Sequence, residues 1–405
     1  MYNNRRSSSG GFNRNNNRFG GRGGGNSGNG GRRFSNRGSK RPLDPRMFVK
    51  KATPIIETQY EPKNNFTDFA LNKIVQKNIL VRGYMKPTAI QDQAMAPIIE
   101  GKDLVGIADT GTGKTAAFLL PLITKISKDR NQKALIITPT RELASQIQDE
   151  LRIFSNNMGI YSALCIGGAS IHMQARQLSR RPQFVIGTPG RIMDLEKRRV
   201  LNLTEYTNVV LDEVDRMLDM GFITDMKYII SFLPKDRQSL FFSATLPEST
   251  KAIMNSFLKD PITVSVKTSA ASQNVDQDIV DTRGKDKVDV LHDLLIQPEF
   301  KKVLVFGRTK WGVNKLEKSL LDRGFKTASI HGNKTQAQRQ RSLNKLQNNE
   351  VQVLLATDVV SRGIDISNVT HVINYNPPET YEDYIHRIGR TGRAGTMGIA
   401  LTFID

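Results

Sequence analysis

Short, almost wholly apolar segments alternate with longer stretches of helical period along most of this chain, and this alternation limits the fold more than any other feature. In the first half the expected strands are Leu104–Ile107, Ala134–Thr138, Ser162–Ile166, Phe184–Gly187, Val209–Leu211 and Leu240–Ser243. Helical stretches such as Thr115–Ile126 and Glu142–Phe154 lie between them. Strands that are apolar on both faces are typical of parallel sheets covered by helices. The sequence therefore predicts an α/β protein with parallel sheets.

The same alternation occurs a second time after a short break. Residues 266–277 are small and polar without periodicity, which favours a linker. The strands expected beyond it are Lys302–Phe306, Thr327–Ile330, Gln352–Ala356 and His371–Asn374. We therefore expect a first domain over residues 52–265, a linker over 266–277 and a second domain over 278–405.

The N-terminal part has a different composition. Residues 1–39 contain only Gly, Asn, Arg, Ser, Phe, Tyr and Met, too little apolar surface to offset the entropy of ordering, so we expect a disordered tail over 1–51. The proline-containing stretch 40–63 is expected to lie extended over the first domain. Arg and Gly interleaved with Phe12, Phe19 and Phe34 are typical of a disordered arm that binds RNA or proteins, and the alternative is a solubilising spacer.

Charge and composition exclude several classes of protein. The 59 Lys and Arg against 39 Asp and Glu give a net charge of +20, which favours a polyanionic partner. A single cysteine, Cys165, excludes an intrachain disulfide and a Cys-type zinc cluster. No apolar run approaches the ~18–20 residues of a membrane span, and the N-terminus does not resemble a secretory signal. These features predict a cytoplasmic protein without a membrane partner.

A glycine-rich loop after the first strand has the form of a phosphate-binding site. The candidate phosphate ligands are Thr110, Gly111, Thr112, Gly113, Lys114 and Thr115. Glycines let the backbone wrap the phosphates, Lys114 reaches the outer phosphates and the Thr115 hydroxyl can ligate Mg²⁺. A plain glycine-rich turn before a helix is the alternative, and the strand–loop–helix context makes it less favoured.

Acidic residues follow the buried strand Val209–Leu211. Ligands of an open α/β sheet gather at the carboxyl ends of its strands. Asp212 there can hold Mg²⁺, and Glu213 can orient or deprotonate an attacking water. Acidic residues after a strand also serve as helix N-terminal charges, but downstream of a phosphate loop they predict a catalytic site.

These motifs and others follow one another in an order that is similar to that of the DEAD-box RNA helicases of helicase superfamily 2, and to their bacterial RhlE-like subgroup. Over residues 64–405 the matching segments are Phe66, Gly83-Tyr84, Pro87–Gln91, the phosphate loop, Pro139–Ala144, Gly167-Gly168, Thr188–Arg191, Asp212–Asp215, Ser243–Thr245, Phe306, Thr309, His331-Gly332, Gln336, Arg339, Ala356–Asp358, Arg362–Asp365 and His386–Arg393. The departures are Val214 in place of Ala and Gly307-Arg308 in the fourth motif.

The resemblance implies two tandem RecA-like domains and an RNA-stimulated ATPase that uses ATP and Mg²⁺. It assigns Phe66 and Gln91 to the adenine, Asp365 to the ribose, and Arg390 and Arg393 to the transition-state charge as arginine fingers. The resemblance also assigns the coupling of domain closure to Asp215, Ser243, Thr245, His386 and Arg387. Without the family resemblance, Gln91 would be interpreted as an exposed helical residue and Phe66 as a core residue.

RNA contacts are expected from loops that follow the strands. The resemblance assigns Arg141, Gly168, Thr188 and Arg191 in the first domain, and Thr309, Gly332, Arg339 and Thr357 in the second. Their hydroxyls, backbone amides and guanidinium groups suit phosphates and 2′-hydroxyls, which predicts low sequence specificity on single strands or short duplexes. Some of them also suit caps, since Thr188 precedes Pro189 as a helix start. Trp311 begins a helix, where packing is favoured over a role as a base platform.

Three functions remain open at this point. The first is an RNA helicase that hydrolyses ATP to ADP and phosphate and locally unwinds short duplexes. The second is an ATP-gated RNA clamp that turns over slowly within a ribonucleoprotein, and the third is a translocase that acts on DNA. The motif around Gln91 and the Asp-Glu-x-Asp pattern disfavour the third.

Overall fold

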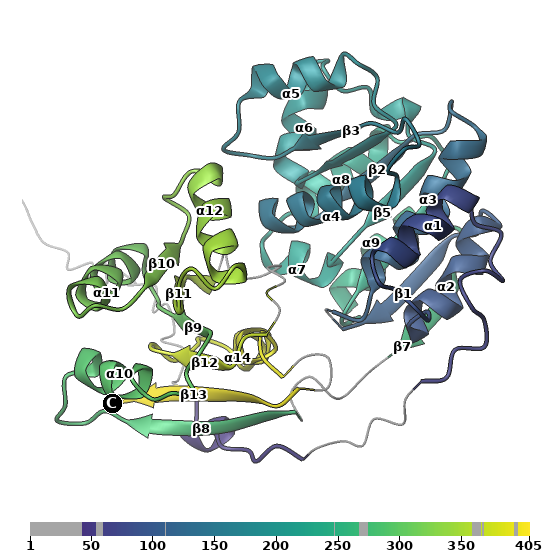
Figure 1. Ribbon diagram of the computed structural model, residues 1–405. Helices are drawn as coiled ribbons and strands as arrows, with labels where there is room; N and C mark the ends of the chain where they lie inside the picture. The colour runs from purple at the N-terminus through teal and green to yellow at the C-terminus, as the bar shows by residue number, and fades with distance from the viewer. Residues whose placement is uncertain are drawn as a thin grey trace, which may run out of the picture. The chain divides into compact units, whose positions relative to one another are not determined.

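Two parallel sheets form the framework of the protein (Figure 1). The computed structural model describes residues 43–53, 60–109, 111–246, 248–266, 274–358, 366, 368–392 and 396–405. Both sheets consist of short strands with helices packed on both of their faces. The predicted α/β class with two parallel sheets is therefore confirmed.

The first sheet has seven strands in the order β3-β4-β2-β5-β6-β1-β7. Its strands are β1 (Leu104–Ala108), β2 (Ala134–Ile137), β3 (Ser162–Cys165), β4 (Phe184–Gly187), β5 (Asn208–Leu211), β6 (Gln238–Ser243) and β7 (Ile262–Val266). Its helices are α1 (Lys73–Val81), α2 (Ala89–Ile99), α3 (Lys114–Lys128), α4 (Arg141–Phe154), α5 (Ile171–Leu178), α6 (Pro189–Lys197), α7 (Val214–Asp219), α8 (Ile223–Phe232) and α9 (Glu248–Phe257), with a 3-10 turn η2 at Leu203–Glu205. Leu104 of β1 lies opposite Leu240 of β6 and Ile262 of β7.

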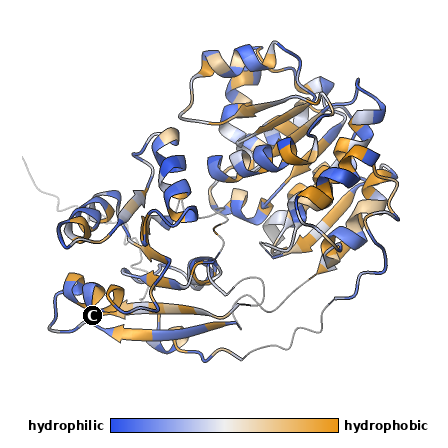
Figure 2. Cartoon of the chain, viewed as in Figure 1, coloured by the Kyte–Doolittle hydropathy of each residue, from blue (hydrophilic) through white to orange (hydrophobic). Residues whose placement is uncertain are grey.

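Two apolar cores lie on opposite faces of this sheet. Alternate strand residues supply them, so Leu104 and Ile136 belong to one core while Val105 and Leu135 belong to the other. All four of these residues are essentially inaccessible to solvent. Figure 2 shows the resulting pattern, with apolar residues along the strands and polar residues on the outer sides of the helices.

The second sheet has six strands in the order β10-β11-β9-β12-β13-β8. These are β8 (Val275–Asp281), β9 (Val303–Phe306), β10 (Thr327–Ile330), β11 (Val353–Ala356), β12 (His371–Asn374) and β13 (Gly398–Ile404). The helices are α10 (Lys287–Leu295), α11 (Lys310–Asp322), α12 (Gln336–Gln347) and α14 (Tyr381–Ile388). Here too Val303 and Leu304 face separate apolar cores.

Helices that begin just after a strand bring polar loops to one edge of each sheet. Helices α3, α4, α6 and α7 start within a few residues of the carboxyl ends of β1, β2, β4 and β5. Thr140 caps α4 by accepting a hydrogen bond from the Leu143 amide. Thr335 and Gln338 form a capping box at the start of α12. Because parallel strands end at the same edge, the loops of each sheet converge there.

The segment before the first domain packs on the second sheet. Residues 43–51, expected to belong to the disordered tail, form a 3-10 helix η1 (Pro45–Phe48), and Lys50 makes an antiparallel bridge to Gln277 of β8. Phe48 is 1% exposed, and its ring centroid lies 4.8 Å from that of Tyr384 in α14. The expectation that residues 40–63 lie over the first domain is thus wrong for this part, because Phe48 joins an apolar core of the second sheet.

Two further observations concern the expected linker and the helices. Strand β7 runs to Val266 and β8 begins at Val275, so strand residues enter the expected linker 266–277 from both sides.

Within the described ranges, no helix is both long and apolar enough to cross a membrane.

Candidate active site

The loop between β1 and α3 forms a cradle of backbone and one buried lysine. Gly111 and Gly113 adopt φ values of +86° and +95°, which side chains other than glycine rarely allow. Lys114 is 7% exposed, and its ammonium donates to the Ala108 carbonyl at 2.7 Å, across the loop. Thr112 Oγ1 donates to the Asp109 carbonyl at 2.8 Å. This is the geometry expected of a phosphate-binding loop at a helix N-terminus.

Gln91 braces the loop from behind. Its Nε2 donates to the Gly113 carbonyl at 3.1 Å, its Oε1 accepts from the Thr88 amide at 3.0 Å, and the side chain is 2% exposed. A Cβ on Gly113 would lie 2.4 Å from Gln91 Nε2, so only glycine fits there. The expected role of Gln91 in reading adenine stays a prediction. Both the amide nitrogen and the amide oxygen of Gln91 already make hydrogen bonds within the protein.

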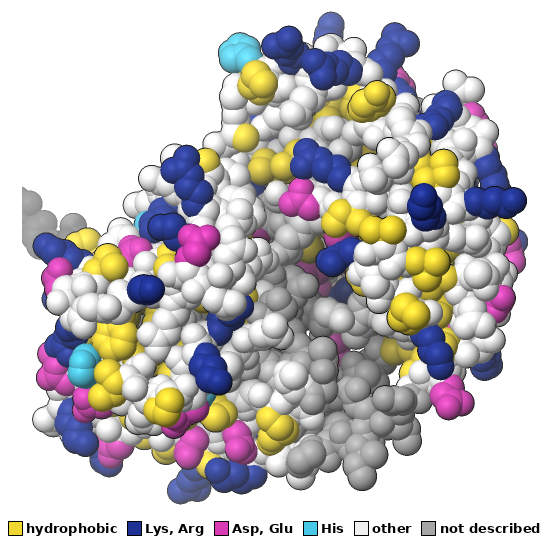
Figure 3. Space-filling view, viewed as in Figure 1, with side chains coloured by type: hydrophobic (Ala, Val, Ile, Leu, Met, Phe, Trp, Pro, Cys, Tyr) yellow, Lys and Arg dark blue, Asp and Glu magenta, His cyan; other side chains and the backbone are white. Residues whose placement is uncertain are grey.

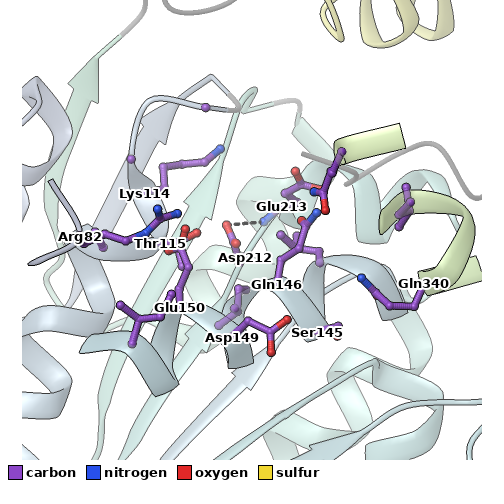
Figure 4. Close-up of a pocket in the computed structure, with 18 of the residues that line it drawn as sticks. Arg82, Lys114, Thr115, Ser145, Gln146, Asp149, Glu150, Asp212, Glu213 and Gln340 are labelled. Carbon is purple, nitrogen blue, oxygen red and sulfur yellow. Dashed lines mark hydrogen bonds between the residues drawn. The ribbon is translucent and has the colours of Figure 1, made fainter. Parts of the chain in front are cut away.

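A cleft of about 640 Å³ opens beside this loop. Lys114, Thr115, Asp212, Glu213 and Arg390 all line it. In Figure 4 Lys114 and Thr115, at the start of α3, lie around the same space as Asp212.

The sequence analysis missed several residues of this cleft. Arg82 lines the cleft beside Tyr84, which the sequence analysis had named, and so do Gln146, Asp149 and Glu150 of α4. The proximity of Arg82 to the Gly83-Tyr84 pair was the signal that could have identified it. Phe66 instead belongs to an apolar core and is 6% exposed, so its expected contact with the base stays a prediction.

Two buried carboxylates stand at the end of β5. Asp212 is 2% exposed and accepts from the Glu213 amide at 3.0 Å. Burial, with a smaller contribution from the neighbouring Glu213, raises the pKa of Asp212 to about 7, although Lys114 opposes the shift. Glu213 lies at φ +52°, a strained backbone conformation that is frequent at functional sites.

Arg216 holds the Glu213 side chain. Its Nη1 donates to Glu213 Oε2 at 2.5 Å, and the two side chains are 4% and 8% exposed. Burial disfavours the charged form of Glu213, but Arg216, Lys114 and Arg390 outweigh this effect and lower the pKa of the carboxyl. The sequence analysis did not single out Arg216.

Asp215 joins the end of β5 to the end of β6. Its Oδ2 accepts from the Thr245 amide at 2.9 Å and the Thr245 hydroxyl at 3.1 Å. Ser243 Oγ accepts from the Asp215 amide at 3.3 Å and donates to the Thr245 carbonyl at 2.7 Å. Three of the five residues expected to couple domain closure to hydrolysis thus form one hydrogen-bonded unit.

In the second domain Arg387 acts as an internal clamp. It is 3% exposed and donates from Nε and Nη2 to both carboxylate oxygens of Asp358, at 2.6 and 2.8 Å. It also donates to Asn374 Oδ1 at 3.1 Å, which ties α14 to β12. His386 precedes it on α14, and the Arg390 Nε donates to the His386 carbonyl at 3.3 Å. Three expected site residues, Thr110, Asp365 and Arg393, lie outside the described residues.

The RNA residues expected in the first domain gather around a second cleft. Arg141, Thr188 and Arg191 line this cleft of about 540 Å³. A Cβ on Gly168 would lie 2.2 Å from Arg141 Nη1, so glycine at this position lets the guanidinium lie against the loop. Arg191 Nη1 donates to the Ala169 carbonyl at 3.2 Å. The Thr188 hydroxyl makes no capping hydrogen bond at the start of α6.

The RNA residues expected in the second domain follow β9, β10 and β11. Thr309 caps α11 by accepting from the Gly312 amide at 3.0 Å, and Gly332 and Thr357 follow the next two strands. Arg339 is 6% exposed and donates to Glu142 Oε2 at 2.8 Å. Burial raises the pKa of Glu142. The positive charge of Arg339 partly offsets this effect. Any phosphate that binds Arg339 must therefore compete with a buried carboxylate.

Comparison with known proteins adds a second line of evidence. The pattern of the DEAD/DEAH box helicase family matches residues 88–253, and that of the helicase conserved C-terminal domain matches residues 286–395. The ATP-dependent RNA helicase CshA of Limosilactobacillus reuteri is 45% identical over 341 residues, which are 84% of this chain and 69% of that protein. CshA of Listeria monocytogenes is 45% identical over 342 residues, 84% of this chain and 66% of the relative. The chain thus spans about two thirds of the length of these relatives.

Solved structures show the same two-sheet architecture. S. cerevisiae Dbp5 bound to RNA and ADP BeF3 aligns with a TM-score of 0.73 at 30% identity, over 84% of this chain and 89% of that one. Mss116p bound to ssRNA and AMP-PNP aligns with a TM-score of 0.75 at 27% identity, over 85% of this chain and 76% of that one. The expectation of tandem RecA-like domains is confirmed.

Proposed function

The chain belongs to the DEAD-box helicases and is an ATP-dependent RNA helicase, and from this premise we propose how its residues divide the work. ATP is hydrolysed to ADP and phosphate in the cleft beside the phosphate loop, coupled to binding of single-stranded RNA and local unwinding of short duplexes. The observation that carries the proposal is the convergence of Lys114, Asp212, Glu213 and Arg390 on that one cleft.

The loop and a metal ion would hold the triphosphate. The backbone at Gly111, Thr112 and Gly113 wraps the phosphates, and Lys114 exchanges its hydrogen bond with the loop for one with them. The site fits Mg²⁺, because Asp212 is a deeply buried carboxylate whose ionised form needs a nearby cation. Thr115 and Asp212 would hold the ion, which when bound neutralises phosphate charge.

Glu213 and Arg390 would act on the reacting atoms. Glu213 is kept ionised by its neighbours, so it can orient the attacking water and accept its proton. Arg390 would stabilise the charge that develops on the transferred phosphoryl group. Arg393 as a second arginine finger and Asp365 at the ribose are carried over from the family resemblance alone.

RNA would be held through its backbone. Arg141, Arg191, Thr309 and Arg339 offer donors suited to phosphates and 2′-hydroxyls, so we expect low sequence specificity. On binding RNA, Arg339 exchanges its buried pair with Glu142 for a phosphate. The solved relatives described above hold RNA or ssRNA, which supports this part of the proposal.

A duplex-separation assay distinguishes unwinding from clamping. We expect multiple turnovers of a short RNA duplex with ATP and none when Arg191→Ala and Arg339→Ala are combined. Arg198→Ala is the control for Arg191, since Arg198 is an exposed arginine at the C-terminal end of the same helix, α6. RNA retention with slow turnover and no strand separation would favour the clamp, and equal activity of the double variant would contradict the RNA assignments.

Three broader expectations belong to the same proposal. The relatives named above are CshA proteins, so placement in the RhlE-like subgroup stays a prediction, as does a cytoplasmic location. The role of residues 1–39 in binding RNA or proteins is likewise proposed from composition. Deleting residues 1–39 should weaken RNA affinity and flatten its salt dependence, whereas an unchanged salt slope would make this segment a spacer.

A further inference from the structure

The chain has a single tryptophan, and the structure turns it outward. Trp311 lies on the first turn of α11 and is 73% exposed. The sequence analysis favoured a packing role, and that interpretation is wrong because the ring contributes to neither core of the second sheet. A single exposed apolar side chain is not by itself evidence of a ligand, so the assignment depends on what surrounds the ring.

The surroundings of the ring are cationic. Arg308, Lys310 and Lys315 are exposed on both sides of it in the sequence, and the Lys315 ammonium lies 5.6 Å from the ring centroid. Glu317 is the one acidic residue between positions 308 and 318, and its carboxylate lies 3.6 Å from the Lys334 ammonium. Charge complementarity therefore favours an anionic partner with flat, stackable groups.

Trp311 borders the loops to which we assign RNA contacts. Thr309 caps α11, the helix whose first turn contains Trp311. The Lys310 side chain lies over Gly332, where an added Cβ would come within 3.2 Å of Lys310 Cε, and its ammonium donates to Asn333 Oδ1 at 3.0 Å. The ring thus stands at the same edge of the sheet as Thr309 and Gly332. Figure 3 shows Lys and Arg side chains on the face of the second domain that carries α12.

We propose that Trp311 is a stacking platform for a nucleobase of the bound RNA, next to the nucleotides held through their phosphates, with Lys310 and Lys315 neutralising the adjoining phosphates. The inference rests on the proposed function and extends it, since the backbone contacts proposed above do not engage bases. Stacking tolerates any base, so the platform adds affinity without sequence specificity. A protein partner is disfavoured because Arg308, Lys310 and Lys315, which are exposed and close to the ring in the sequence, are cationic rather than apolar.

The single tryptophan makes the test direct. Excited at a wavelength that tyrosine does not absorb, the full chain reports on Trp311 alone. We expect titration with a short oligouridine, in the presence of a non-hydrolysable ATP analogue and Mg²⁺, to quench the emission. RNA should also protect the ring from quenching by acrylamide. Binding is followed in parallel by the anisotropy of labelled RNA.

Variants separate stacking from charge. Trp311→Ala should weaken RNA binding roughly 5- to 150-fold, the range expected for one base–aromatic stack, with the salt slope unchanged. Trp311→Phe should recover most of the affinity because a ring remains. Lys310→Ala should instead lower the salt slope by about 0.7. Tyr161→Ala, which removes a 68% exposed aromatic ring in the first domain, is the matched control and should bind RNA as wild type does.

Two results would overturn the proposal, and they differ. If wild type binds labelled RNA while the emission stays constant and Trp311→Ala binds equally well, the platform is refuted and the helicase assignment stands. If wild type binds no RNA by anisotropy, the RNA contacts proposed for this edge fail together with the platform.

Discussion

Replacing Arg216 by methionine tests how the proposed catalytic base is kept ionised. Methionine keeps an unbranched apolar side chain, shorter than that of arginine, and removes the guanidinium charge. In the structure Arg216 Nη1 donates to Glu213 Oε2 at 2.5 Å in a site where both side chains are almost fully buried. The substitution therefore leaves Glu213 with fewer compensating charges in a buried site.

The size of the effect follows from the energetics of buried ion pairs. Removing one partner of such a pair costs about 3–5 kcal/mol unless the other partner loses its charge. Glu213 can lose its charge by binding a proton, so its pKa rises in the variant. Each 1.36 kcal/mol of lost stabilisation of the ionised carboxylate raises that pKa by one unit. Lys114 and Arg390 still favour the ionised form. We therefore expect kcat to fall about tenfold near pH 7, more below it, and to recover as the pH rises.

The assay is RNA-stimulated ATP hydrolysis measured across pH 6–9 at saturating ATP. Arg237→Met is the control, because Arg237 is also partly buried but donates to Ser239 Oγ and to backbone carbonyls far from the site. It should lower stability and leave the pH dependence of kcat unchanged. If Arg216→Met keeps the wild-type pH profile, Arg216 does not control the ionisation of Glu213 and the reasoning fails.

Three other predictions concern stability and nucleotide binding. Phe48→Ala should destabilise the second domain by about 3–5 kcal/mol in urea unfolding, whereas Met47→Ala, at an exposed neighbour, should change it little; equal effects would contradict the packing. Gln91→Ala should raise the KM for ATP, because it frees the Gly113 carbonyl behind the phosphate loop, and an unchanged KM would count against this role. Burial lowers the pKa of His371 to about 4, so the folded state holds it neutral, and stability should decline by up to about 1.4 kcal/mol per pH unit as pH falls from 6.5 toward 4. His371→Leu should flatten that decline in thermal unfolding, and an unchanged slope would refute the assignment.

Local patterns were sufficient for most of the framework. The expected strand Phe184–Gly187 has the observed bounds of β4, and Leu104–Ile107 differs from β1 by one residue. Both are short apolar runs whose burial on two faces leaves a clear compositional signal. The helix expected at Glu142–Phe154 begins one residue earlier, at Arg141, where Thr140 provides the cap.

Long-range pairing was what the sequence could not reveal. Phe48 packs on Tyr384, and Lys50 pairs with Gln277, across separations of more than two hundred residues. No local pattern in the short, proline-containing stretch around Phe48 indicates which sheet it joins. Trp311 shows the same limit, since its place at a helix start does not specify whether the ring faces a core or solvent.

Within the site, the sequence motifs identified which residues lie there better than they identified what each residue does. Lys114, Asp212 and Glu213 were found from spacing and lie around one cleft. The hydrogen bonds of Gln91 to Thr88 and Gly113, and the pairing of Arg216 with Glu213, depend on side-chain directions that only packing defines. These contacts explain how the loop and the base are held in place.

The most direct test of the account is ATP hydrolysis by the wild type and by Glu213→Gln, each measured alone, with single-stranded RNA and with single-stranded DNA. We predict strong stimulation by RNA, little by DNA, and loss of the stimulated rate in Glu213→Gln with ATP binding retained. Equal rates with and without RNA, or a variant as active as wild type, would contradict the claim that the cleft of Lys114, Asp212 and Glu213 couples RNA binding to ATP hydrolysis.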